Sequence, residues 1–190
     1  MRKRSHRVAL CILGAAAFSL SACVEEEVDA AAFPDLAACK ATAALGTQGF
    51  SATDCDTAFA EAEVIHAEAA PRYDSLTVCE EQHGEGACDE QVASGGGGGG
   101  IFMPLMAGYL IGNMLNRNGP AAQPLYRSAS GNFTNAAGTT SYASNSGAGK
   151  LGATQFARPA TTIGKAPMTA ASVQSRGGFG GSAAGRSTGG

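Results

Sequence analysis

The sequence predicts a mainly α protein: a small helical domain closed by disulfides, with a cleaved signal peptide before it and a long disordered C-terminal tail after it. Helix-capping residues and four of the six cysteines occur between residues 35 and 93. No run of residues alternates β-branched and polar side chains, as half-buried strands do. Residues 118–190 consist mostly of Gly, Ala, Ser and Thr, a composition that is typical of disorder.

The charges divide the chain into an acidic and a basic part. The net charge is only −3, yet all 16 acidic residues lie between Glu25 and Glu90. No acid follows Ala93, and glycine supplies 27 residues of the chain. The bases of this acid-free part are Arg117, Arg127, Lys150, Arg158, Lys165, Arg176 and Arg186. This asymmetry excludes an evenly built globule and a large enzyme domain.

Residues 1–22 have the organisation of a lipoprotein signal peptide. Basic residues precede an apolar stretch, Val8–Ser19, of about 12 residues, whereas a membrane span needs roughly 20. The stretch ends in Leu20-Ser21-Ala22-Cys23, which resembles a bacterial lipobox. We therefore expect cleavage before Cys23 and anchoring in the lipid bilayer by acyl chains on that residue. The alternative is an ordinary signal peptide with an incidental cysteine.

The residues after Cys23 bear on localisation. Val24 occupies the position at which aspartate would retain a lipoprotein in the inner membrane, by resemblance to lipoprotein sorting in Gram-negative bacteria. We expect a cell-envelope protein that faces the periplasm, with the outer membrane favoured over the inner. Residues 23–34 carry several acids and are expected to form a lipidated acidic tether, as a solvated spacer.

The cysteines of residues 35–93 predict two disulfides. They are Cys39, Cys55, Cys79 and Cys88. Disulfides commonly stabilise small exported domains. Three pairings are possible, and we favour Cys39–Cys55 with Cys79–Cys88, because each closes a short loop across a glycine-containing turn. A metal site of Cys79, His83 and Cys88 is the alternative, but the spacing matches no strong zinc pattern.

Three helices are expected in this acidic domain. Asp35 can cap a helix that ends near Leu45. A Ser51-Ala52-Thr53-Asp54 capping box opens a longer helix that ends near Ala70. Ser75 can cap a third helix that stops near Gly84. His66 falls near the apolar face of the second helix, which predicts a packed histidine at a domain edge.

Residues 94–100 are expected to be a flexible glycine linker, followed by an apolar Gly/Met helix over 101–117. Gly108 and Gly112 stand four residues apart, a spacing that allows close approach between helices. This helix can dock on the disulfide domain, on another copy or an envelope partner, or on the membrane surface. Its contact residues would be Met103, Leu105, Met106, Gly108, Tyr109 and Gly112.

Residues 118–190 are expected to form a disordered basic tail with isolated aromatics. Its candidate motif comprises Arg176, Gly177, Gly178, Phe179, Gly180 and the terminal Gly190. RGG segments bind single-stranded nucleic acid, but one such triplet in an exported chain does not predict a nucleic-acid partner.

The sequence shows no nucleophile with a base and no carboxylates placed across a cleft, so we assign no catalytic residue, metal or cofactor. Redox-active cysteines are an alternative, but there is no Cys-x-x-Cys motif and structural pairs are the usual case. The expectation is a non-enzymatic structural or interaction module.

Four segments carry a resemblance to a known family. They are Ala70-Pro71-Arg72-Tyr73, the stretch from Cys79 to Cys88 with Gly84-Glu85-Gly86, Met103-Pro104-Leu105-Met106-Ala107-Gly108-Tyr109, and Arg176-Gly177-Gly178-Phe179-Gly180. Together with the lipobox, they make the chain similar to the YgiB-like family of uncharacterised bacterial lipoproteins. Genes of that family often lie near ATP-grasp amide ligases. The resemblance thus implies an alternative function, in which such a ligase modifies the carboxylate of Gly190.

Overall fold

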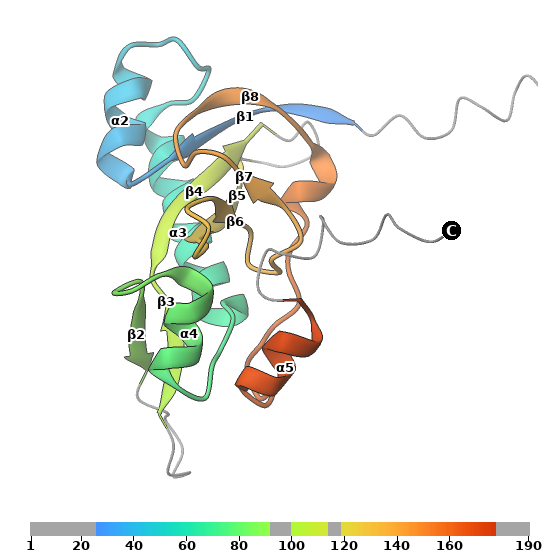
Figure 1. The fold of residues 1–190 in the computed structure, drawn as a ribbon. Helices are drawn as coiled ribbons and strands as arrows, with labels where there is room; N and C mark the ends of the chain where they lie inside the picture. Colours follow the sequence, from blue (N-terminus) through green and yellow to red (C-terminus); the bar gives the residue numbers. More distant parts are fainter. Residues whose placement is uncertain (1–25, 92–99, 114–118, 178–190) are drawn as a thin grey trace, which may run out of the picture.

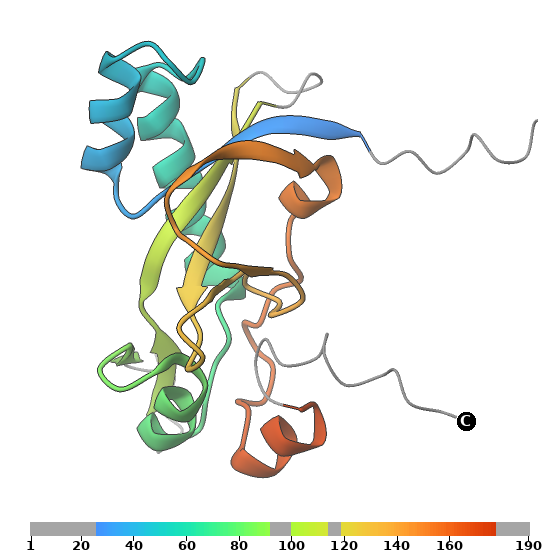
Figure 2. The ribbon, with the colours of Figure 1, turned by 45° about the horizontal axis from the view of Figure 1, so that its top comes forward.

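The computed structural model describes residues 26–91, 100–113 and 119–177, and these residues form a mainly β fold. A six-stranded antiparallel sheet has the order β7-β6-β5-β4-β1-β8, and β2 and β3 form a second sheet. The prediction of a mainly α protein is therefore wrong. Figures 1 and 2 show that the large sheet is curled, with helices α2 and α3 to one side of it.

The strands are β1 (Glu27–Phe33), β2 (Cys88–Gln91), β3 (Ile101–Pro104), β4 (Met106–Gly112), β5 (Ala121–Arg127), β6 (Phe133–Thr134), β7 (Ser141–Tyr142) and β8 (Gly147–Gly152). The helices are α2 (Leu36–Ala44), α3 (Ala52–Ala69), α4 (Leu76–His83), the 3₁₀ turn η2 (Ala153–Phe156) and α5 (Ala170–Ser175). The signal peptide, Cys23, residues 94–99 of the expected linker and residues 178–190 lie outside the described residues.

The three predicted helices of the acidic domain are confirmed, because their capping signals are local. The Asp35 carboxylate accepts a hydrogen bond from Ala38 N at 2.8 Å at the start of α2. Ser51 and Asp54 form the reciprocal capping box of α3, and Ser75 caps α4.

Strand β1 lies within residues 23–34, the expected acidic tether, and the prediction of a spacer is wrong for the residues of this strand. Residues Glu27–Phe33 lie between β4 and β8 in the sheet, so they are not a spacer. β8 is more than 100 residues away in sequence, yet it pairs with β1 in register from Glu27↔Gly152 to Ala32↔Gly147. The two strands run side by side in Figure 1.

The apolar segment predicted as a helix over 101–117 instead forms strands β3 and β4, and its last residues are not described. β4 lies between β1 and β5 and is covered on both faces. Tyr109 and Ile111 pack in one apolar cluster with residues of α3, while Leu110 packs in another with Phe156. A strand that is buried on both faces shows no polar alternation, and this is why its sequence resembles a buried helix.

Gly108 and Gly112 allow close packing around strand β4, and not a contact between helices as predicted. Gly108 has φ +141°, and a Cβ placed there would lie 2.7 Å from the carbonyl oxygen of Phe33. A Cβ on Gly112 would lie 2.5 Å from the ring of Phe156. Both glycines therefore permit close packing that a side chain would block.

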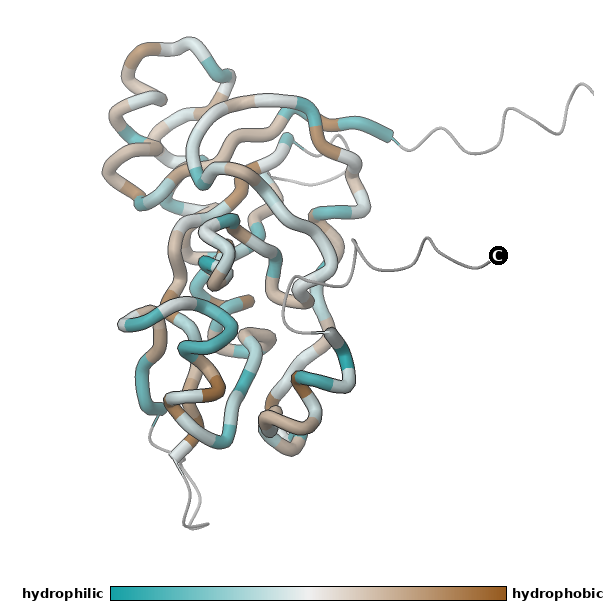
Figure 3. Tube along the Cα trace, in the orientation of Figure 1, coloured by the Kyte–Doolittle hydropathy of each residue, from teal (hydrophilic) through white to brown (hydrophobic). Residues whose placement is uncertain are grey.

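The predicted disordered tail is wrong for residues 119–177. β5 is buried along its whole length except at Arg127, and Tyr126 and Phe156 are core residues. Isolated aromatics thus enter the core one at a time, from segments whose small residues allow close approach. Figure 3 shows strongly hydrophobic residues scattered along the trace rather than gathered in one segment.

Candidate functional site

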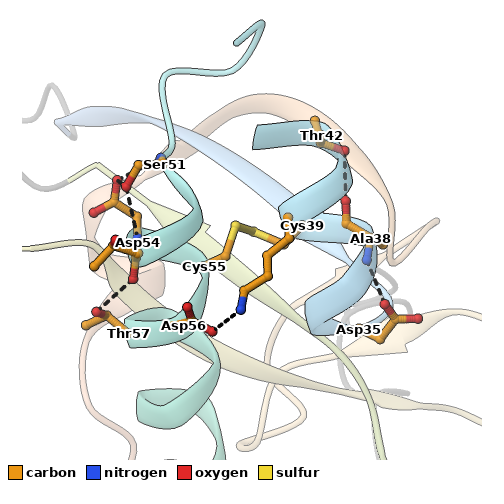
Figure 4. The surroundings of a disulfide bond; sticks show 11 residues. Asp35, Ala38, Cys39, Thr42, Ser51, Asp54, Cys55, Asp56 and Thr57 are labelled. Carbon is orange, nitrogen blue, oxygen red and sulfur yellow. Dashed lines mark hydrogen bonds and ion pairs between the residues drawn. A yellow bond between two sulfur atoms is a disulfide. The ribbon is translucent and has the colours of Figure 1, made fainter. Parts of the chain in front are cut away.

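Both predicted disulfides are present. Cys39 of α2 bonds to Cys55 of α3, and all atoms of the two residues are buried. Figure 4 shows this bond between the two helices, beside the caps made by Asp35 and Ser51. The ion pair between Lys40 and Asp56, at 2.6 Å, joins the same helices on the surface. The bond fixes α2 against α3, which itself packs on the sheet.

The second disulfide, Cys79–Cys88, joins α4 to β2. Because both sulfurs are in this bond, the alternative of a metal site with Cys79, His83 and Cys88 is wrong. Among the described residues, no group of three or more His, Cys, Asp or Glu side chains is arranged to hold a metal ion.

His83 is instead the centre of a buried polar cluster. Its side chain is 0% exposed. Its Nδ1 lies 2.7 Å from the Arg127 carbonyl oxygen, and its Nε2 lies 2.8 Å from the Tyr73 hydroxyl. A carbonyl can only accept, so Nδ1 carries the proton and Nε2 of the neutral ring accepts from Tyr73. Burial lowers the pKa of His83 to about 4, against a smaller raising effect of the Arg127 carbonyl.

His66 lies at the other side of the same cluster. Its Nδ1 is hydrogen-bonded to the hydroxyl of Tyr126 at 3.0 Å. Burial, followed by the charge of Arg72, lowers the pKa of His66, while Glu63 raises it. The rings of His83 and Tyr126 are in edge contact, with centroids 6.3 Å apart. His66, as predicted from its place on α3, is a packed and half-buried histidine.

A basic pocket of about 250 Å³ lies beside this cluster. One wall comes from the connection after α3, including Arg72, and the other from residues 159–168 and the end of α5 at Arg176. Hydrogen bonds join the two walls, because Met168 N donates to Arg72 O at 2.7 Å and Thr162 N donates to Glu68 O at 2.9 Å. The pocket therefore depends on the packing of the C-terminal part against α3.

The charges of the pocket are positive. Arg72, Lys165 and Arg176 line it, and no described lining residue is acidic. The Arg72 guanidinium donates to Thr162 Oγ1 at 3.1 Å and to the Ala67 carbonyl at 2.9 Å, which are both neutral acceptors. Glu68 lies on the preceding turn of α3, but Arg158 binds its carboxylate at 2.7 Å.

The pocket brings together residues that are far apart in the sequence. Arg72 and Arg176 belong to two of the segments that carry the family resemblance, and both line the pocket. Lys165, the third base of the pocket, does not stand out in the sequence, because nothing in its low-complexity segment indicates that the segment folds back onto α3. Met103, Tyr109 and Gly112 are buried in the sheets, and Leu105 is half exposed.

Some predicted features are not placed in a site. Cys23 and the motif residues Gly178, Phe179, Gly180 and Gly190 lie outside the described residues, whereas Gly177 directly follows Arg176 at the end of α5. In the part of the chain that the structure describes, no helix has both the length and the apolar character to cross a membrane.

Comparisons with known proteins agree with the resemblance. The family model "Protein of unknown function (DUF1190)" matches residues 27–190. A UPF0441 protein of Erwinia tasmaniensis is 32% identical over 96% of this chain and 84% of its own length. UPF0441 proteins of Klebsiella pneumoniae and Serratia proteamaculans are 30% and 31% identical over similar spans.

No solved structure matches the chain. The family match extends over nearly the whole chain from β1 onward, and the relatives align with almost all of it. The chain therefore belongs to the DUF1190 family of proteins of unknown function, which is the YgiB-like family that its motifs resemble.

Proposed function

We propose that this protein is a lipid-anchored, non-enzymatic interaction module of the bacterial cell envelope. The observation that carries the proposal is the pair of disulfides, Cys39–Cys55 and Cys79–Cys88. Disulfides form and persist in oxidising compartments such as the periplasm, and the sequence before β1 resembles a lipoprotein signal peptide. The function assigned is binding rather than catalysis.

The polar clusters of the structure support a binding role. The hydroxyl of Tyr73 is used in a hydrogen bond to His83, and the cysteines are closed in disulfides. The basic pocket offers positive charge without a carboxylate or a thiol among its described lining residues. Such a set of groups binds and orients an anion, but it does not supply a nucleophile with a base.

The position of Cys23 relative to the fold also favours anchoring. β1 begins at Glu27, only four residues after Cys23. A lipid on Cys23 would thus hold the folded part within a short reach of the bilayer, since four extended residues span roughly 13 Å. In this arrangement the sheet, rather than a long tether, adjoins the membrane.

Intact and peptide mass spectrometry of the membrane-extracted, unreduced protein tests the proposal. We expect an N-terminal peptide that starts at Cys23 and carries acyl chains, together with both disulfide-linked peptides. Cys23→Ser should abolish the acyl mass, whereas Cys11→Ser should not, because Cys11 lies in the cleaved segment. An unmodified Cys23 in membrane-extracted protein would refute the anchor.

The choice of membrane is tested separately. The proposal favours the outer membrane because Val24 follows the lipidated cysteine. Val24→Asp should move the protein to the inner-membrane fraction in a density gradient, whereas Val24→Ala should leave it in the outer-membrane fraction. An inner-membrane location of the unchanged protein would contradict this part of the proposal.

The alternative, amidation of the Gly190 carboxylate by an ATP-grasp ligase, rests on the family resemblance. The same mass measurement distinguishes it, because extra mass on the C-terminal peptide would make residues after α5 the functional part. A plain C-terminal peptide under all growth conditions would exclude this alternative.

A further inference from the structure

We propose that the basic pocket formed by Arg72, Lys165 and Arg176 binds a phosphate ester, a phosphate group that carries a short aliphatic moiety. The inference deepens the proposed function by naming a ligand class for the interaction module. It rests on that function only for the compartment, the cell envelope, in which the protein would encounter the ligand. Binding at the pocket and lipidation at Cys23 are separate measurements, so either can fail alone.

The positive charge of the pocket is not compensated within the described residues. No acidic residue follows Glu90 in the sequence, so the C-terminal wall of the pocket cannot supply a carboxylate. Two other bases that follow residue 119 form ion pairs with acids of residues 26–91: Lys150 pairs with Asp29, and Arg158 pairs with Glu68. In the described residues, Lys165 and Arg176 form no ion pair, and both line the pocket. An anion from outside the chain would complete this arrangement.

The Arg72 side chain is held in position before any ligand binds. Its Nε and Nη2 donate to Thr162 Oγ1 and Ala67 O, which hold the guanidinium in place without neutralising it. Thr162 is itself fixed, because its hydroxyl lies 2.8 Å from the Ala70 carbonyl oxygen. A guanidinium held in this way loses little side-chain entropy when it binds an oxyanion. Arginine also matches the geometry of phosphate oxygens.

The size and the walls of the pocket fit a small ligand that has an apolar part. A volume of about 250 Å³ lies below the roughly 300–1,000 Å³ of pockets for drug-sized ligands. The pocket thus suits one small group rather than a large molecule. Ala69, Pro71 and Met168 supply apolar wall beside the three bases. A bare inorganic ion would leave this wall uncovered, whereas the carbons of a glycerol phosphate group would contact it.

Thermal unfolding of the full-length mature protein tests the inference, because a ligand that binds only the folded state raises Tm. One arm titrates glycerol 3-phosphate, with glycerol as the uncharged control, into protein in a neutral detergent. The other arm compares protein in nanodiscs of phosphatidylglycerol with protein in nanodiscs of phosphatidylcholine. A response in the first arm indicates a soluble phosphate ester, and a response only in the second indicates a lipid headgroup.

The variant pair makes the result specific to the pocket. Lys165→Gln with Arg176→Gln removes two exposed bases and should weaken binding by about tenfold for each base. Lys40→Gln with Arg127→Gln removes the same charge from two residues that do not line the pocket and should leave binding unchanged. No saturable response in either arm would overturn the inference. An equal loss in both variant pairs would also overturn it, because the response would then follow net charge alone.

Discussion

Residues 26–91 and the later described residues, 100–113 and 119–177, are stabilised by different kinds of contact. The first region has helices with local caps and two disulfides that close short loops. The second region consists mainly of strands, and it is held by pairing of β4 and β8 with the distant β1 and by isolated aromatics in the core. The contrast shows that low sequence complexity does not imply disorder when another part of the chain supplies the partner strands and the packing surface.

Among the substitutions that test this contrast, the largest loss of stability is expected at Phe156 of the second region. Its side chain is 5% exposed and packs against Gly112 and Leu110. Phe156→Ala should lower the free energy of unfolding by about 3–5 kcal/mol, the cost of removing a buried aromatic ring. Ile163→Ala, at a side chain that is 58% exposed in the same region, should change it by less than about 0.5 kcal/mol. Chemical denaturation measures both, and equal effects would contradict the core role of Phe156.

The next effect concerns the N-terminal region. The Cys39–Cys55 bond closes a loop with a sequence separation of 16. The chain-entropy relation gives such a bond about 3 kcal/mol of stability. The double variant Cys39→Ala, Cys55→Ala should lose approximately that amount in denaturant titration. Cys79→Ala with Cys88→Ala, with a separation of 9, should lose slightly less, about 2.5 kcal/mol. Unchanged stability on reduction of either bond would contradict its structural role.

His83 joins the two regions, and its pKa predicts a pH dependence. The folded-state pKa is about 4 and the ordinary value is 6.5. Between these values the unfolded state binds a proton that the folded state does not. The contribution of neutral His83 to the free energy of unfolding should therefore be fully present above pH 6.5. It should decrease as the pH falls towards 4, by up to roughly 3 kcal/mol. Denaturant titrations at several pH values measure this loss.

The control for His83 is His83→Gln, which removes the titration. This variant should be less stable at neutral pH but should show a smaller decrease in stability between pH 6.5 and 4. The difference between the two slopes isolates the histidine from the carboxylates, which titrate in both proteins. Parallel pH profiles would show that His83 does not contribute.

The smallest effect compares two buried tyrosines. The Tyr73 hydroxyl is bonded to His83, whereas the buried Tyr109 hydroxyl has no hydrogen-bond partner among the described residues. Tyr73→Phe should cost about 1–2 kcal/mol, because it removes the hydroxyl that donates to Nε2 of His83. Tyr109→Phe should be neutral or stabilising by up to about 1 kcal/mol. Thermal unfolding measures both, and the opposite order would contradict the assigned hydrogen bonds.

The features that could be predicted from the sequence are those with local causes. Asp35, Ser51 and Ser75 cap helices through residues three positions later, and each disulfide closes a short loop. The sheet could not be predicted in this way. β4 shows no alternation of polar and apolar residues because both of its faces are buried. One of the two strands that pair with β1 is β8, more than 100 residues away, and no residue near β1 in the sequence indicates this pairing.

The basic pocket shows the same limit. Arg72 and Arg176 stand out in the sequence only through their motifs, and nothing indicates that they meet. Their meeting requires the hydrogen bonds between Arg72 and Met168 and between Glu68 and Thr162. Each of these bonds joins residues more than 90 positions apart, where single-sequence patterns carry no information.

Hydrogen–deuterium exchange of the full-length mature protein, read by peptide mass spectrometry, tests the central claim most directly. The fold predicts that amides of β5, which lies inside the sheet, and of β8, which pairs with β1, exchange far more slowly than an unstructured chain. Strong protection at 121–127 and measurable protection at 147–152 would support one sheet built from both regions. Exchange at unstructured rates across 119–177, with protection confined to 35–91, would contradict it and restore the disordered tail.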